Sequence, residues 1–169
     1  MRSWTFALFV GITYLSVGLL GLVPEALKPP PADAPPLHFN LLHGHLLGLF
    51  PVNLLHSAVH VAIGLWGIAA WRGVVSPKGY ARALAIFYGT LAVMGLIPGL
   101  RTVFGLFPIY GHDVWLHAAT AAVAAYFWWH PEVDHRAGEA RDRRVQTVPV
   151  PQERRVGHDR RLPYNTESD

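Results

Sequence analysis

Four apolar segments, each about long enough to cross a bilayer as a helix, constrain the fold of this chain more than any other feature. They cover residues 5–23, 54–71, 83–100 and 114–129. The first contains no charged side chain, and a helix of that length, rising about 1.5 Å per residue, crosses the roughly 30 Å hydrocarbon core of a bilayer. We therefore predict an all-α fold, a four-transmembrane-helix bundle within residues 1–130.

The fixed charges are concentrated after this domain. Only nine side chains of residues 1–130 carry one, whereas eight Lys/Arg and eight Asp/Glu follow position 130, in a chain that is 51% hydrophobic. We attribute the net charge of +3 to membrane topology and predict no nucleic-acid partner. The chain contains no Cys, which excludes disulfides, thiolate chemistry and Cys-ligated metal sites.

The Lys and Arg residues of the short connections predict the orientation. Arg2, the connection at 72–82 and the Arg-rich tail fall on one side of the predicted bundle, which is the cytoplasmic side by the positive-inside rule. We therefore expect cytoplasmic termini and an external loop at residues 24–53. Its first half is rich in proline and should run as an extended arm, and its second half is apolar and should lie at the outer interface.

Residues 131–169 are polar and lack apolar periodicity. Such a segment does not bury enough surface to offset the entropy cost of ordering it. We predict a largely disordered cytoplasmic tail.

An internal repeat relates the two halves of the predicted bundle. With a shift of 74 positions the first apolar segment matches the third, and with a shift of 57 the second matches the fourth. The identities are Ile12/Ile86, Tyr14/Tyr88, Gly21/Gly95, Leu22/Leu96 and Pro24/Pro98, then GLFP at 48–51 and 105–108, His60/His117, Ala62/Ala119 and Trp71/Trp128. We predict two tandem hairpin repeats in parallel orientation, with a pseudo-axis along the membrane normal.

The repeat makes His60 and His117 symmetry mates and aligns His56 with Asp113. His56 and His60 are four positions apart, a spacing that places both imidazoles on one helix face. Together the four side chains form a hypothetical site for zinc, copper(II), nickel or non-haem iron, or a bis-His site for haem b. Asn53 and His112 are predicted as supporting polar residues.

Two other interpretations of this His/Asp cluster stay open. Ionisable groups within a membrane are costly and often functional, so the cluster could relay protons or bind another small ligand. Alternatively, neutral His, Asn and Asp side chains cross-link helices by hydrogen bonds and need no ligand. In that structural interpretation no cofactor is bound.

The strings GLFPVNLLHSAVH and GHDVWLH resemble the pattern of small bacterial four-helix integral membrane proteins catalogued as a domain of unknown function. The resemblance covers roughly residues 3–130 and implies a multi-pass protein of the bacterial inner (cytoplasmic) membrane, without implying an activity. The residues that carry this resemblance most specifically are Asn53, His56, His60, Asp113 and His117.

From the sequence we favour a non-enzymatic membrane protein whose outer-leaflet cluster is structural or binds a small ligand. No nucleophile constellation, phosphate loop or HExxH motif occurs in the chain. One alternative is a metal- or haem-binding protein in metal handling or electron transfer. Another is an accessory subunit of a larger membrane complex, bound through the proline-rich arm or the arginine-rich tail.

Overall fold

The computed structural model describes residues 3–130, and these are mostly helical. The helices are α1 (Ser3–Leu20), α2 (Leu54–Trp71), α3 (Pro77–Leu96) and α4 (His112–Trp129). The connections contain two 3-10 turns, η1 (Pro24–Ala26) and η2 (Pro98–Leu100), and three strands, β1 (Leu27–Lys28), β2 (Gly44–Leu46) and β3 (Phe50–Val52). The predicted tail at 131–169 lies outside the described residues.

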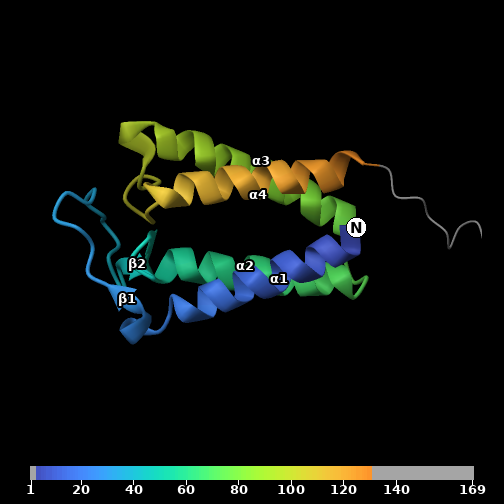
Figure 1. Ribbon diagram of the computed structural model, residues 1–169, viewed down its shortest axis with the longest axis horizontal. Coiled ribbons are helices and arrows are strands. Elements are labelled where there is room, and N and C mark those ends of the chain that lie inside the picture. Colours follow the sequence, from blue (N-terminus) through green and yellow to red (C-terminus); the bar gives the residue numbers. More distant parts are fainter. Residues whose placement is uncertain (1–2, 131–169) are drawn as a thin grey trace, which may run out of the picture. The chain divides into compact units, whose positions relative to one another are not determined.

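The four helices form two antiparallel hairpins that lie side by side (Figure 1). In one hairpin α1 packs along α2, and in the other α3 packs along α4. The long connections, residues 21–53 and 97–111, meet at one end of the bundle, which we call the loop end. The short α2–α3 connection and the start of α1 lie at the opposite end. This arrangement makes α1 parallel to α3, and α2 parallel to α4.

Local capping signals decide where the helices begin and end. The Asn53 side chain accepts a hydrogen bond from the His56 N–H at 2.9 Å and so caps α2. Ser76 caps α3 in the same way, with proline at the first helical position. The third helix therefore begins before the predicted residue 83. It also ends before the predicted residue 100, because Ile97 precedes a proline and adopts an extended conformation.

The all-α prediction needs one correction, since the chain between α1 and α2, which was predicted to be external, contains a three-stranded antiparallel sheet in the order β1-β2-β3. Leu46 pairs with Leu27 on one side and with Phe50 on the other. Its side chain is buried, as is that of Val52, so the apolar second half of the loop folds back on itself. Pro51 is tolerated because β3 is an edge strand.

The proline-rich first half of the loop also differs from the predicted extended arm at its start. Residues Pro24–Ala26 form one 3-10 turn. The proline stands in the first position of this turn, where its missing N–H costs no hydrogen bond. The chain then enters β1, which pairs with β2, and this pairing ties the arm to the rest of the loop.

Small residues allow α1 and α2 to pack with their backbones in contact. A Cβ atom added to Gly67 would lie 2.7 Å from the Gly11 Cα and 2.8 Å from the Ala7 carbonyl oxygen. A Cβ atom on Gly18 would lie 2.7 Å from the backbone nitrogen of Val61. We call this contact, formed by Gly11, Gly18, Gly64 and Gly67, the glycine seam; it is typical of helices packed within membranes.

Aromatic side chains join the two hairpins toward the opposite end. Phe6 of α1 stacks on Phe127 of α4 with ring centroids 4.7 Å apart. Tyr80 of α3 donates a hydrogen bond to the Ile63 carbonyl oxygen of α2 at 3.2 Å. These side chains belong to one buried and largely apolar core.

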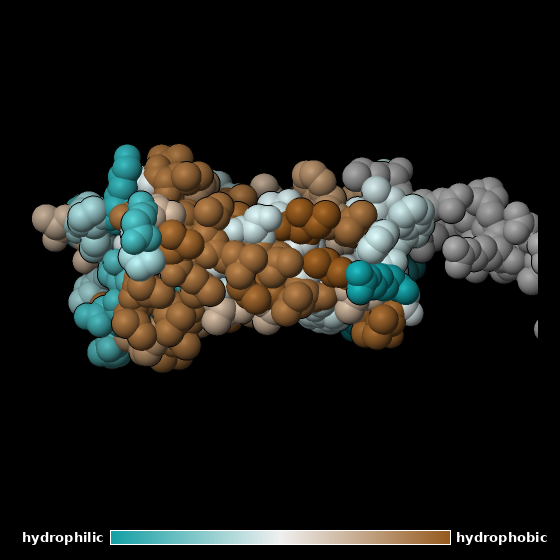
Figure 2. Space-filling view, turned by 90° about the horizontal axis from the view of Figure 1, so that it is seen from below, coloured by the Kyte–Doolittle hydropathy of each residue, from teal (hydrophilic) through white to brown (hydrophobic). Residues whose placement is uncertain are grey.

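The face of the bundle that Figure 2 shows is apolar between two more polar ends. Large hydrophobic side chains are exposed along the helices, including Phe9, Val93 and Val123. Three helices, α1, α2 and α3, are long and apolar enough to cross a membrane. Helix α4 matches α1 in length but is less apolar, because it includes His112, Asp113 and His117.

Candidate functional site

The predicted cluster residues converge in the bundle interior toward the loop end. His56 and His60 project from the first two turns of α2, and Asp113 and His117 from the first two turns of α4. All four are almost completely buried, with 0 to 3% of each side chain exposed. Two helices from different hairpins therefore present their polar first turns to each other.

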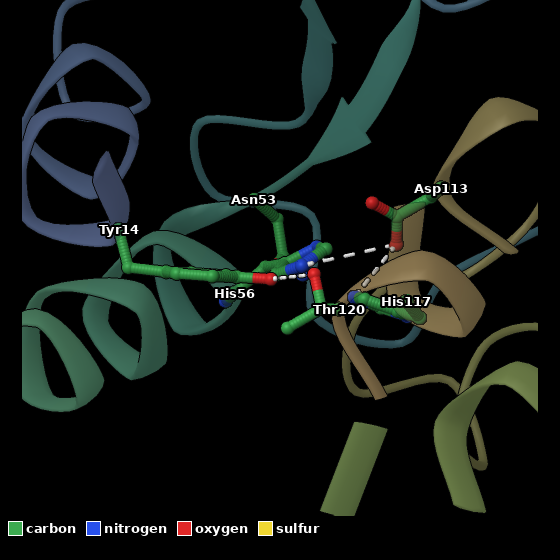
Figure 3. Close-up of polar contacts among 6 residues, drawn as sticks. All are labelled: Tyr14, Asn53, His56, Asp113, His117 and Thr120. Atoms are coloured by element: carbon green, nitrogen blue, oxygen red, sulfur yellow. Dashed lines mark hydrogen bonds and ion pairs between the residues drawn. The ribbon is translucent and has the colours of Figure 1, made fainter. Parts of the chain in front are cut away.

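The Asp113 carboxylate lies between two imidazoles (Figure 3). Its Oδ2 atom is 3.4 Å from Nε2 of His117 and 3.9 Å from Nε2 of His56. The His56 ring centroid is 4.5 Å from that of His60 and 6.1 Å from that of His117. One ring nitrogen from each histidine can be chosen so that all three lie within 4.8 Å of one another.

Several polar atoms of this cluster have no hydrogen-bond partner among residues 3–130. They are Nδ1 of His56, Nδ1 of His60, both ring nitrogens of His117 and Oδ2 of Asp113. A buried polar atom left without a hydrogen bond costs about 1–3 kcal/mol. Several such atoms lie close together, so other interactions must offset their combined free-energy cost. A bound ligand that contacts several of them would do so.

The supporting residues predicted from the sequence take different positions. Asn53 is fully buried and directs its amide away from the cluster, donating to the Phe39 carbonyl oxygen at 2.8 Å and to the Leu106 carbonyl oxygen at 2.7 Å. Asn53 thus links the start of α2 to the α1–α2 connection and to the α3–α4 connection. His112, by contrast, is exposed and lies outside the cluster. The carbonyl groups of Pro51 and Pro108 also interact with the His56 ring.

Two tyrosines that were not assigned to the site pack directly against it. Tyr14 of α1 lies with its ring centroid 5.0 Å from that of His60, and Tyr88 of α3 lies 5.0 Å from that of His117. The two tyrosine rings are 5.1 Å apart. The Tyr14 hydroxyl is 2.8 Å from the Thr120 hydroxyl (Figure 3). All four helices therefore contribute to the cluster and its surroundings.

The self-alignment contained the signal for these tyrosines, because Tyr14 and Tyr88 are matched residues of the repeat. Their role was missed because buried aromatic residues usually serve packing, and nothing in the spacing along α1 and α3 points to the histidines. Only the crossing of the hairpins brings each tyrosine onto its histidine.

The geometry suits a tetrahedral metal ion. Zinc binds imidazole nitrogen at about 2.0–2.1 Å, which places neighbouring ligand atoms about 3.4 Å apart. The three nitrogens lie within 4.8 Å of one another, so rotation of the imidazole rings can bring them to that spacing. The Asp113 carboxylate is not part of this group of three, but its Oδ2 atom lies 3.4 Å from Nε2 of His117 and is the nearest candidate for a fourth ligand.

The same geometry does not favour haem b. A porphyrin ligated by His60 and His117 would have to extend between the helices on all sides of the iron. The rings of Tyr14 and Tyr88 already pack against these two histidines and against each other. A macrocycle would therefore have to displace both tyrosines.

Comparison with known families gives one match. The family described as "Domain of unknown function (DUF4383)" matches residues 4–130, which confirms the resemblance to a domain of unknown function and covers all four helices. No curated protein and no solved structure matches the chain significantly.

Proposed function

The chain belongs to the DUF4383 family, whose description states no activity, and from the site itself we propose that it is a membrane protein that binds one divalent transition metal ion between its two hairpins. Zinc fits the donor set best, since His and Asp side chains in a four-coordinate arrangement are typical zinc ligands. His56, His60, His117 and Asp113 would hold the ion. The metal would thereby fasten α2 to α4.

One observation carries this proposal: one ring nitrogen from each of three buried histidines lies within 4.8 Å of the other two, and a carboxylate lies beside them. Each of these histidines also has at least one ring nitrogen without a hydrogen-bond partner among residues 3–130. A purely structural network would instead pair these atoms by hydrogen bonds. Among the described residues, the Asn53 amide nitrogen donates to backbone carbonyls and its oxygen accepts from the His56 backbone N–H, so none of these bonds involves an imidazole ring. The structural interpretation therefore leaves most of the cluster's polar atoms unsatisfied.

The donor set favours binding over catalysis or proton transfer. Four protein ligands would fill a tetrahedral zinc ion, whereas catalytic zinc keeps a position for water. Below the cluster, toward the opposite end, the buried core includes Phe6, Val10, Leu84 and Phe127. This packing is largely apolar, and the Tyr80 and Ser3 hydroxyls in it already donate to the carbonyl oxygens of Ile63 and Phe127, so we take the site as closed on that side.

The wider setting is also part of the proposal. We infer that α4 crosses the membrane with the other three helices, since it lies along α3 and its face away from the core exposes Trp115, Val123 and Trp129. The charge distribution supports cytoplasmic termini in a bacterial inner membrane. A membrane-impermeant thiol reagent should label Ala34→Cys and not Ser76→Cys in intact cells; the reverse pattern would overturn this topology.

The two hairpins fit an origin by duplication. The matched pairs Tyr14/His60 and Tyr88/His117 have equal ring separations of 5.0 Å. The two GLFP segments share an uncommon backbone, because the residue before each glycine and the glycine itself have positive φ angles: 57° and 75° at Leu47 and Gly48, 58° and 84° at Phe104 and Gly105. These likenesses support tandem repeats in parallel orientation.

The direct test measures bound metal. The full-length protein in lipid nanodiscs is incubated with Zn²⁺, dialysed and analysed by mass spectrometry for metal per chain. We expect one zinc ion in the wild type and none in the His60→Gln or His117→Gln variants, because an amide is a poor substitute for imidazole. His130→Gln, at the far end of α4, is the matched control and should retain the ion.

Failure to bind zinc would not by itself favour the structural interpretation. The same preparation is therefore also titrated with Cu²⁺, Ni²⁺ and Fe²⁺. Absence of all four ions from a folded wild type would reject the proposal. The accessory-subunit hypothesis stays a prediction, since the arginine-rich tail lies outside the described residues.

A further inference from the structure

A cavity of about 580 Å³ lies at the loop end of the bundle. Its wall combines side chains from the external loop, from the α3–α4 connection and from the first turn of α4. The residues with polar or charged side chains are Asp33, His45, Arg101, Tyr110 and His112, and Trp115 closes one side. Three of these, two imidazoles and a carboxylate, are metal-ligand types.

The cavity and the His/Asp cluster share a wall. Pro51 and Val114 are buried residues that line the cavity. The Pro51 carbonyl group interacts with the His56 ring, and Val114 follows Asp113 directly in α4. His112, on the cavity side, precedes Asp113. A cavity residue and a cluster residue are therefore adjacent in sequence at the start of α4.

The cavity side chains are held in place by contacts of their own. His45 stands in β2 opposite Pro51 of β3. Its Nε2 atom is 3.2 Å from the Tyr110 hydroxyl, which links the external loop to the α3–α4 connection. This contact positions an imidazole at the cavity wall on one side, while His112 stands at the start of α4 on the other.

Burial of the cluster makes a route of access necessary. With at most 3% of each side chain exposed, the four ligands do not meet an ion directly from water. The opposite end is blocked by the apolar core, and the sides face lipid. At the loop end, polar side chains line the way to the cluster. A divalent cation that loses its water ligands needs such side chains to replace them, because loss of its hydration is costly.

We propose that this cavity is the loading site through which a divalent transition metal ion reaches the cluster, with His45, His112 and Asp33 contacting the ion one after another. These three side chains are not among the groups whose ligand atoms lie close enough together to hold one ion. The proposal rests on the proposed function. Asp33 and Arg101 carry opposite charges, so the cavity has no strong net charge. Capture therefore depends on the imidazoles and not on long-range attraction. Pro51 and Val114 separate the two positions and must shift for the ion to pass.

The test separates the rate of loading from the affinity of the final site. Metal-free protein in nanodiscs is mixed with Zn²⁺ in a stopped-flow instrument, and a fluorescent zinc indicator reports the remaining free ion. The double variant His45→Ala/His112→Ala should load at least ten times more slowly than the wild type. Its final stoichiometry and its equilibrium affinity should stay within twofold.

Two controls address structural side effects. His43→Ala/His130→Ala also removes two imidazoles, one from the same loop and one from the other end of α4, and should load at the wild-type rate. Tyr110→Phe removes the hydroxyl contact that positions His45 but keeps both imidazoles, and should slow loading less than the His45→Ala/His112→Ala variant does. Loss of rate in His43→Ala/His130→Ala, or an equal loss in Tyr110→Phe and the double variant, would show that loop integrity, and not metal capture, sets the rate.

The outcomes distinguish this inference from the proposed function. If wild-type protein binds zinc and the His45→Ala/His112→Ala variant loads at the wild-type rate, the cavity is not the route. If that variant binds zinc with reduced stoichiometry, these histidines are part of the final site and the inference is wrong. If the wild type binds none of the four ions, the proposed function fails and the loading site fails with it.

Discussion

The glycine seam and the His/Asp cluster join helices in opposite ways. At the seam, α1 and α2 touch through backbone, and a Cβ atom on Gly11 would lie 2.9 Å from the backbone nitrogen of Ile68. At the cluster, long side chains bridge α2 and α4, and several of their polar atoms lack hydrogen bonds within residues 3–130. The glycine seam needs no ligand to complete its contacts. The polar atoms of the His/Asp cluster that lack hydrogen bonds would gain partners only if a ligand bound there.

This difference separates folding from function. Backbone packing defines the first hairpin and leaves no room for adjustment, because protein interiors tolerate added volume poorly. Under the proposed function, the cluster joins one hairpin to the other and responds to an ion. We therefore expect substitutions at the seam to act on stability with or without metal, and substitutions at the cluster to act mainly through metal binding.

The largest expected effect is at the seam. Gly67→Ala should lower the free energy of unfolding by about 3 kcal/mol, since the new Cβ meets backbone of α1 that does not move independently. Gly89→Ala is the matched control on α3, where the new Cβ would lie 3.8 Å from the nearest atom, the Ala121 Cβ. It should change stability by less than about 1 kcal/mol. Thermal unfolding in detergent measures both.

If both glycine substitutions cost the same, close backbone approach does not distinguish the first hairpin. If Gly67→Ala loses stability only when metal is present, the seam and the cluster are coupled. Either result would contradict the proposed difference between the glycine seam and the His/Asp cluster.

The second effect concerns the cluster. Zinc at one hundred times its dissociation constant should stabilise the wild type by about 2.7 kcal/mol. His117→Gln and His117→Leu should both lose this increment, because neither side chain replaces an imidazole ligand. In a chelator, the Gln variant should unfold close to the wild type. A Gln variant that keeps the zinc-dependent increment would remove His117 from the ligand set.

The third effect sharpens the role of Asn53, which caps α2 just before the cluster residues. Asn53→Ala should cost about 2 kcal/mol, because it removes the cap of α2 and two hydrogen bonds to loop carbonyls. Asn53→Ser keeps a capping oxygen but not the amide donors, and should cost about 1 kcal/mol. Equal losses for the two variants would mean that the cap contributes little and that the loop contacts dominate.

The smallest effect is a pH dependence in the external loop. Burial, and secondarily the neighbouring His45, lower the pKa of His43 from its usual 6.5. The folded state therefore favours the neutral imidazole, so its contribution to stability is complete above pH 6.5 and is lost as the pH falls toward the lower folded pKa. His43→Gln should lose less stability than the wild type between pH 7.5 and about 5.5, measured in chelator. If the free energies of unfolding of the two proteins change equally with pH, His43 does not contribute to this pH dependence and the prediction is wrong.

The architecture was largely accessible from the sequence because charge-free apolar segments leave few ways to fold in a membrane. The four helices, and the pairing of first turns carrying His56, His60, Asp113 and His117, follow from segment length and the self-alignment. The end of α3 was placed too late because the apolar run continues past Pro98. Its start was placed too late because Lys78 and Arg82 were assigned to a loop, although both are exposed on the helix.

The external loop and the outer parts of the site were less accessible. Strand pairing of Leu46 with Leu27 and Phe50 joins segments of only two or three residues, which are too short to show a clear alternation. The contacts of Tyr14 and Tyr88 depend on how the hairpins cross, which the sequence pattern does not encode residue by residue. His112 was grouped with the cluster by position alone, and one residue along a helix turns a side chain by about 100°.

The central claim is that three imidazoles and the Asp113 carboxylate bind one metal ion between the hairpins. X-ray absorption spectroscopy of the zinc-loaded full-length protein in nanodiscs tests it most directly, because it reports the ligand atoms themselves. The account predicts four nitrogen or oxygen ligands at about 2.0–2.1 Å with the scattering pattern of three imidazoles, and loss of this zinc signal in His60→Gln protein. A spectrum of zinc ligated by oxygen alone, or one unchanged by His60→Gln, would contradict it.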